Sequence, residues 1–236
     1  MTILSKNKIW RYRFIIIILY SLTIYPILAK DTIVIISGIE VGISYPEVKS
    51  KGNILILNGW NFHFNDCCVK SNFCNEALKR GYVLIMPNMG KSIYHTKVYN
   101  ETRKDWKNFP TRVKLTDTII PYMQNKLGLL KYGDNNYIYG ISTGARGAML
   151  IAIYKIDLFR GIACLSGDYN QTTMKNDNLM KGYYGDYNIY KNRWTSEDNP
   201  YYNADKIECY VYMSHGKRDK VVNYLQTKEM GNRLLK

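Results

Sequence analysis

Histidine, proline and acidic residues are scarce in this chain of 236 residues. It has three histidines, six prolines and 19 acidic residues, against 33 lysines and arginines. No internal repeat is visible, which excludes a collagen-like chain. With 46% hydrophobic and 22% charged residues, the chain is neither intrinsically disordered nor a disulfide-held miniprotein. It is long enough for one compact domain that buries most of its apolar surface.

Positive charge is in excess, with a formal net charge of +14, and no acidic residue precedes Asp31. Such an excess is one signature of nucleic-acid binding. Here the lysines are spread along the chain and form no long block. The chain is also rich in Lys, Asn, Ile and Tyr together, a bias that fits an AT-rich coding sequence. We therefore expect no nucleic-acid partner.

The N-terminus has the pattern of an export signal. A basic stretch, 1–13, is followed by the apolar run 14–29, which is short for a membrane-spanning helix. Pro26 interrupts the run, and Ala29 is small enough for a cleavage site. We expect a secretory signal cleaved near Ala29, with an uncleaved membrane anchor as the alternative. Either way, the domain 30–236 is expected to be secreted, periplasmic or in the cell envelope, with no other membrane contact.

Cysteine placement agrees with export, since exported proteins keep disulfides. Cys67, Cys68 and Cys74 lie within eight residues, and we expect Cys74 to pair with Cys68 or Cys67. Metal binding with His63 is the alternative, but no second Cys/His pair follows at zinc-like spacing. The other two cysteines lie in strand-like runs and are expected to be buried free thiols: Cys164 and Cys209.

Short apolar runs alternate with helical patterns along the chain, which predicts an α/β fold with a mostly parallel sheet covered by helices on both faces. The expected strands are 32–37, 53–57, 82–86, 137–140, 162–165 and 208–213. The expected helices are 69–80, 111–127, 145–156 and 224–236. Gly81 is expected to end the first as a left-handed cap, and Pro121 to cause a kink or a boundary in the second.

One long segment, 167–206, interrupts this alternation, and we call it the excursion. An excursion of 40 residues in a compact domain is usually functional or contains helices of its own. Two interpretations stay open: its aromatic side chains pack it onto the body, or it forms a lid or a wall for a substrate. Those side chains are Tyr169, Tyr183, Tyr184, Tyr187, Tyr190, Trp194, Tyr201 and Tyr202.

The segment 140–144 has the pattern G-x-S-x-G, with a strand-like run before it and a helical run after it. This context predicts a sharp strand–turn–helix that exposes the hydroxyl of Ser142. The turn is too tight for side chains at Gly140 and Gly144. The positive end of the following helix favours negative charge beside the serine. The alternative is a glycine-rich turn whose serine only caps the helix.

An acidic residue, Asp219, follows a later strand in the segment His215–Val222. Catalytic groups gather at the carboxyl ends of parallel strands, so Asp219 is expected near Ser142, where it would orient a histidine. The alternative is a surface aspartate in a turn. His215 is expected to support this loop rather than to act as the base.

Together, these two motifs resemble the α/β-hydrolase superfamily, particularly its secreted serine esterases. The resemblance covers about 32–236 and implies that Ser142 is the nucleophile and Asp219 the acid. The implied reaction is hydrolysis of small-molecule or polymer carboxylic esters through an acyl-serine intermediate. It implies no metal or organic cofactor. It also implies that the backbone N–H groups of Thr143 and of Trp60 (or Asn61) bind the oxyanion. A peptidase is the alternative enzyme on this fold.

One departure from the family pattern concerns the catalytic base. The family places its histidine after the acid, beyond one further helix and strand, whereas His63, His95 and His215 all precede Asp219. The interpretation we favour is a truncated product that lacks the last strand and the base. The others are an inactive hydrolase that binds a partner through the excursion, or recruitment of His95 or His215. We therefore expect little or no esterase activity from this chain.

Overall fold

The computed structural model describes residues 31–106, 109–196 and 198–235. The expected signal or anchor, residues 1–29, lies outside the described residues and stays a prediction. Within the described parts of the chain, no helix has the length and apolar character needed to cross a bilayer.

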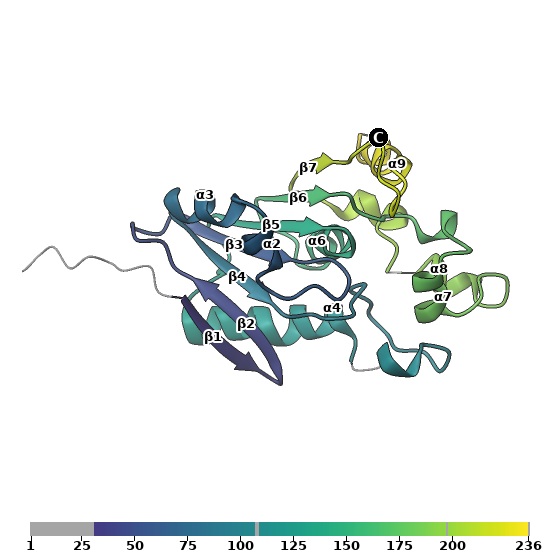
Figure 1. Ribbon diagram of the computed structural model, residues 1–236, viewed down its shortest axis with the longest axis horizontal. Coiled ribbons are helices and arrows are strands. Elements are labelled where there is room, and N and C mark those ends of the chain that lie inside the picture. Colours follow the sequence, from purple (N-terminus) through teal and green to yellow (C-terminus); the bar gives the residue numbers. More distant parts are fainter. Residues whose placement is uncertain (1–30, 107–108, 197, 236) are drawn as a thin grey trace, which may run out of the picture.

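Seven strands form one mixed sheet in the order β1-β2-β4-β3-β5-β6-β7 (Figure 1). The strand β2 is antiparallel to both of its neighbours, and the strands from β4 to β7 are parallel. The α/β class and the mostly parallel sheet are thus confirmed. The strands are β1 (Asp31–Ile36), β2 (Ile39–Ser44), β3 (Gly52–Leu57), β4 (Tyr82–Pro87), β5 (Asn136–Ile141), β6 (Gly161–Leu165) and β7 (Tyr210–Ser214).

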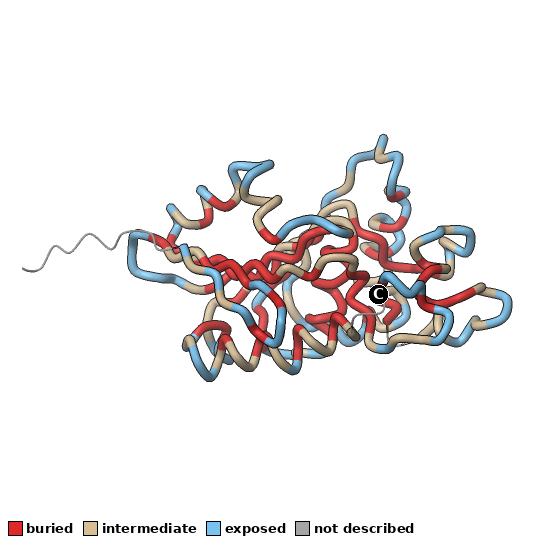
Figure 2. The backbone as a smooth tube through the Cα atoms, turned by 60° about the horizontal axis from the view of Figure 1, so that its bottom comes forward, coloured by how far each residue is buried: buried red, intermediate tan, exposed pale blue. Residues whose placement is uncertain are grey.

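Helices cover both faces of the sheet, and its central strands are buried (Figure 2). One apolar cluster joins the sheet to α6 and to the helical segment 111–127, and a second joins the opposite face to α3. The helices are α2 (Asp66–Lys70), α3 (Phe73–Lys79), α4 (Thr111–Lys114), α5 (Ile120–Tyr122), α6 (Thr143–Tyr154), α7 (Asn178–Tyr184), α8 (Lys191–Trp194) and α9 (Leu225–Leu234). Short 3-10 or π turns are η1 (Lys104–Trp106), η2 (Leu115–Ile119), η3 (Met123–Leu127), η4 (Gln171–Thr173) and η5 (Tyr201–Lys206).

Three local predictions differ from the structure. The strand β2 was not expected, because Gly42 interrupts its apolar pattern; a Cβ there would lie 2.5 Å from the Phe64 ring. The helix expected over 69–80 is two helices, α2 and α3, separated at 71–72. The segment 111–127 continues past Pro121 through two π turns, and Gly128, with φ of 69°, ends it.

The cysteines pair in one of the expected ways. Cys68 forms a disulfide with Cys74, while Cys67 is a free thiol. Cys164 is a buried free thiol, as expected, and Cys209 is a half-buried one. No group of three potential metal-ligating side chains occurs among the residues that the structure describes.

The excursion lies beyond the carboxyl ends of β5 and β6 and contains η4, α7, α8 and η5 (Figure 1). Four of its aromatic side chains, Tyr169, Tyr183, Tyr184 and Trp194, are at most 1% exposed. Three of these four join an apolar cluster with Ile93 and Trp106. The packing interpretation therefore holds for these side chains.

Candidate active site

Ser142 lies in the sharp turn that its sequence pattern predicts, between the end of β5 and the start of α6. Its backbone has φ of 55° and ψ of −125°, a conformation that costs energy for a residue with a side chain. The turn needs glycine on both sides. A Cβ on Gly140 would lie 2.3 Å from the carbonyl oxygen of Gly144, and a Cβ on Gly144 would lie 1.9 Å from that of Leu57.

Two backbone N–H groups beside Ser142 are available for an anion. Those of Thr143, the first residue of α6, and of Trp60 donate to no acceptor within the described parts of the chain. The loop of Trp60 lies against the serine, since a Cβ on Gly59 would be 3.2 Å from the Ser142 Cβ. The N–H of Asn61 donates instead to the Gly90 carbonyl oxygen, at 2.9 Å. Of the two residues expected in this loop, Trp60 is thus the candidate donor.

Asp219 follows β7, at the same end of the sheet as Ser142. Backbone hydrogen bonds tie the three strand ends together: the N–H of Ser142 donates to Leu165, and that of Ser166 donates to Ser214, each at 2.8 Å. The end of β6 thus lies between the strand end that leads into Ser142 and the strand end that precedes Asp219.

The carboxylate of Asp219 is held in its ionised form. Its Oδ1 accepts hydrogen bonds from the N–H groups of Val221, at 2.8 Å, and Val222, at 3.1 Å. Partial burial raises the pKa of Asp219, but these two hydrogen bonds, together with His215 and the Ser166 side chain, outweigh it, and the pKa lies below its usual value.

His215 is engaged within its own loop. Its Nδ1 lies 2.7 Å from the Thr227 Oγ1 of α9, and its Nε2 lies 2.9 Å from the Val222 carbonyl oxygen. The same Nε2 is 3.4 Å from the Asp219 Oδ2. Both ring nitrogens thus hold the loop of Asp219 in place.

The other two histidines are also directed elsewhere. His63 is exposed, with its Nδ1 2.7 Å from Asn65 Oδ1. His95 is fully buried, 3.2 Å from the Thr111 hydroxyl, and burial, aided by the positive charge of Arg146, lowers its pKa to about 4. Among the described residues, no histidine nitrogen is hydrogen-bonded to Ser142. Ser142, the two N–H groups beside it and Asp219 thus lie at the same end of the sheet, and none of the histidines in the described residues is hydrogen-bonded to the serine.

Two buried charges near the site were not singled out from the sequence. Arg146 lies one turn after Ser142 on α6, and Asp168 follows β6. The two carboxylate oxygens of Asp168 have no hydrogen-bond partner among the described residues, and burial raises its pKa to about 6 although Arg146 opposes the rise. The available signal was Arg146, a cation in the first turn of the otherwise apolar run 145–154.

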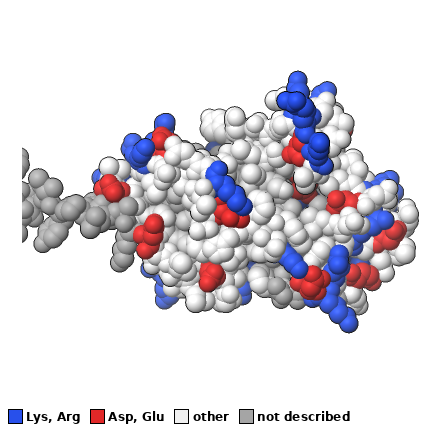
Figure 3. All heavy atoms as spheres, in the orientation of Figure 1, with Lys and Arg blue, Asp and Glu red and all other residues white. Residues whose placement is uncertain are grey.

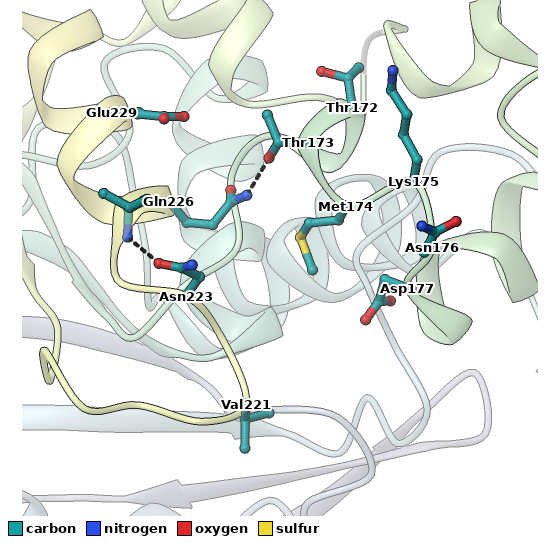
Figure 4. Close-up of a pocket in the computed structure, with 11 residues that line it drawn as sticks. Thr172, Thr173, Met174, Lys175, Asn176, Asp177, Val221, Asn223, Gln226 and Glu229 are labelled. Carbon is teal, nitrogen blue, oxygen red and sulfur yellow. Dashed lines mark hydrogen bonds between the residues drawn. The ribbon is translucent and has the colours of Figure 1, made fainter.

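A hollow of about 780 Å³ opens beside the loop of Asp219 (Figure 4). Its walls are the segment 172–177 of the excursion and the segment from Val221 to Glu229. A hydrogen bond joins the two segments: the Nε2 of Gln226 donates to the Thr173 hydroxyl at 2.7 Å. Neither Ser142 nor Asp219 is among the residues that line it, so this hollow lies beside the loop of Asp219 and does not include either side chain.

Charged side chains of both signs are interspersed among uncharged ones on the face that Figure 3 shows. The positive charges of the described residues on this face form no continuous basic surface of the kind that tracks a phosphate backbone.

One family model matches most of this chain. The family model "Putative esterase" matches residues 39–231. No curated protein matches the sequence of this chain.

Solved structures share the fold at low identity. The serine hydrolase FphF of Staphylococcus aureus has a TM-score of 0.69 and 18% identity, over 89% of this chain and 87% of that one. The S-formylglutathione hydrolase FrmB of the same organism has a TM-score of 0.64 and 19% identity, over 88% and 86%. Est1E of Butyrivibrio proteoclasticus has a TM-score of 0.60 and 14% identity, over 86% and 84%. The chain therefore belongs to this esterase family and has the α/β-hydrolase fold.

Proposed function

We propose that this protein is built to hydrolyse carboxylic esters through an acyl-serine intermediate on Ser142. The observation that carries the proposal is the position of Ser142. It occupies a strained turn at a helix N-terminus, with the free N–H groups of Thr143 and Trp60 beside it. Membership of the esterase family supports the reaction class. The substrate is a small-molecule or polymer ester.

The proposed reaction has two halves. The Ser142 hydroxyl attacks the ester carbonyl carbon while a base takes its proton, and the oxyanion accepts hydrogen bonds from Thr143 and Trp60. The tetrahedral intermediate collapses, and the alcohol leaves with the proton from the base. Water then attacks the acyl-serine in the same way, which releases the acid and regenerates Ser142. The role of Asp219 is to orient an imidazole and to stabilise its charged form.

The base is the element that these residues do not provide. Each histidine is held by partners away from Ser142: His63 by Asn65, His95 by Thr111, and His215 by Thr227 and Val222. A serine hydroxyl without a base is a poor nucleophile at neutral pH. We therefore propose that these residues turn esters over only slowly unless an imidazole is supplied to Ser142.

A fluorophosphonate probe tests whether Ser142 is a nucleophile. FphF is named for binding such compounds. The expected result is labelling of this chain, accelerated by added imidazole and lost in Ser142→Ala. The matched control is Ser37→Ala, since Ser37 also has a positive φ, of 49°, but is exposed in the β1–β2 turn. Equal labelling of Ser142→Ala and the native chain would overturn the assignment.

The second candidate function is non-catalytic binding on a hydrolase fold, and the engagement of both nitrogens of His215 favours it. The same experiment separates the two. Absence of labelling at Ser142, even with imidazole present, would support the binding protein.

A further inference from the structure

Arg146 is the most completely enclosed charge in the described structure, with a side chain that is 0% exposed. It lies on α6, four residues after Ser142. Taking a guanidinium out of water is unfavourable unless its N–H groups find acceptors. The hydrogen-bond partners of Arg146 therefore indicate which parts of the structure its buried charge stabilises.

The guanidinium of Arg146 donates hydrogen bonds to four acceptors that are far apart in the sequence. Its Nε donates to the Ile93 carbonyl oxygen at 3.2 Å. Its Nη1 donates to Gln171 Oε1 at 3.0 Å, and its Nη2 donates to the Tyr184 hydroxyl at 3.1 Å. The Nη2 also donates to the backbone carbonyl oxygen of Asp198. Three of these four acceptors belong to the excursion, at its start, its middle and near its end.

A second set of contacts extends from these partners. The carboxylate of Asp198 accepts hydrogen bonds from the backbone N–H of Thr96, at 2.9 and 3.0 Å, and from the Thr96 hydroxyl. Arg112 Nε donates to that same hydroxyl oxygen at 3.0 Å. The buried carboxylate of Asp168 supplies opposite charge, 3.7 Å from Arg146 Nη1. The excursion is thereby joined both to α6 and to the segment before α4.

These contacts bear on the two interpretations of the excursion. A lid that swings away from the site would leave Arg146 and Asp198 buried without partners, or would expose them with the aromatic side chains of Tyr184 and Trp194. The first outcome is unfavourable because a buried charge without a partner loses its hydration without compensation. The second is unfavourable because it exposes large apolar rings to water. The network is therefore compatible with a fixed excursion and opposes a hinged one.

We propose that Arg146 is a positioning residue that anchors the excursion to α6, so that the excursion is a fixed wall beside Trp60, whose ring packs edge-on against that of Tyr183. The role of the wall in holding an ester rests on the proposed function. The anchoring itself does not, and it is tested separately.

Hydrogen exchange of backbone amides tests the anchoring. We compare the native chain with Arg146→Met, which keeps most of the volume, and with Tyr184→Phe, which removes one hydroxyl partner. Met123→Ala is the matched control, because Met123 is fully buried in the segment 111–127, outside the network. The variants are compared under conditions that give them equal global stability. Arg146→Met should then speed exchange in the excursion at least tenfold. Tyr184→Phe should speed it less, and Met123→Ala should not speed it.

The rate of fluorophosphonate labelling supplies a readout that a purely structural role would not move. Arg146→Met should weaken the binding of a bulky probe at least fivefold while the limiting rate of labelling at saturation changes less than twofold. Arg146→Lys should recover part of the loss. If exchange in the excursion rises no more than in Met123→Ala, the anchoring is wrong. If the native chain is not labelled at all, the proposed function fails, while the exchange result still decides the anchoring.

Discussion

Gly144 packs directly against the end of β3: a Cβ on this glycine would lie 1.9 Å from the carbonyl oxygen of Leu57. The obstacle is backbone in the centre of the sheet, which cannot rotate away as a flexible side chain would. The glycine thus sets how closely the helix after Ser142 approaches the sheet, and with it the position of the Thr143 N–H.

Gly144→Ala should therefore destabilise the protein strongly. Overpacking in a core costs about 1–3 kcal/mol, and we expect the upper end of this range. The matched control is Gly231→Ala in α9, where nothing lies within 4 Å of the added Cβ and where alanine should stabilise the helix by about 0.5–1 kcal/mol. Denaturant unfolding measures both changes. Equal stability of the two variants would contradict the close approach described above.

The buried imidazole of His95 should make stability depend on pH. Its pKa of about 4 in the folded protein lies below the ordinary value of 6.5, so only the unfolded chain binds a proton between these values. His95 alone therefore lowers the free energy of unfolding by up to about 3 kcal/mol as the pH falls from about 6.5 to about 4. In His95→Gln this loss should disappear. An unchanged pH dependence in the variant would show that His95 is not buried in its neutral form.

Asp168 should act in the opposite direction over much of the same range. Its folded pKa of about 6 lies above the ordinary 3.8, so the folded protein binds the proton more tightly. Asp168 alone therefore lowers stability as the pH rises from about 4 to about 6. In Asp168→Asn the free energy of unfolding should rise more steeply with pH than in the native chain. Unfolding curves at several pH values measure the difference, and a shallower slope would contradict it.

The disulfide should make stability sensitive to reductant. Closing so short a loop stabilises a protein by about 2 kcal/mol in the chain-entropy account. Cys74→Ser should lower the Tm and abolish the effect of reductant, whereas Cys67→Ala should leave that effect intact. Loss of the reductant effect in Cys67→Ala would show that Cys67, and not Cys68, is the partner of Cys74.

Local patterns were sufficient to predict most of the sheet and the turn of Ser142. Six of the seven strands are apolar runs with clear ends, and the serine turn depends on residues adjacent in sequence. The strand β2 does not stand out in the sequence because Gly42 interrupts its apolar run. The reason for that glycine is its packing against Phe64, which lies 22 residues away in sequence. The expected α/β-hydrolase resemblance is confirmed by the family match and by the shared fold.

Contacts between distant segments were the part that sequence patterns did not reveal. The network of Arg146 joins residues from Ile93 to Asp198, and no spacing within the sequence indicates such partners. The engagement of His215 by Thr227 depends on how α9 packs after the loop of Asp219. The roles of Ser142, Asp219, Trp60 and Thr143 stay predictions that the experiments decide.

Turnover of a short-chain aryl ester, with and without imidazole, tests the central claim most directly. The native chain, Ser142→Ala and His215→Ala are compared, with the rate of Ser142→Ala taken as background, since free imidazole itself cleaves aryl esters. We predict that the native chain exceeds this background only slightly without imidazole, and clearly with it. Strong turnover without imidazole that both substitutions abolish would contradict the account and identify His215 as the base.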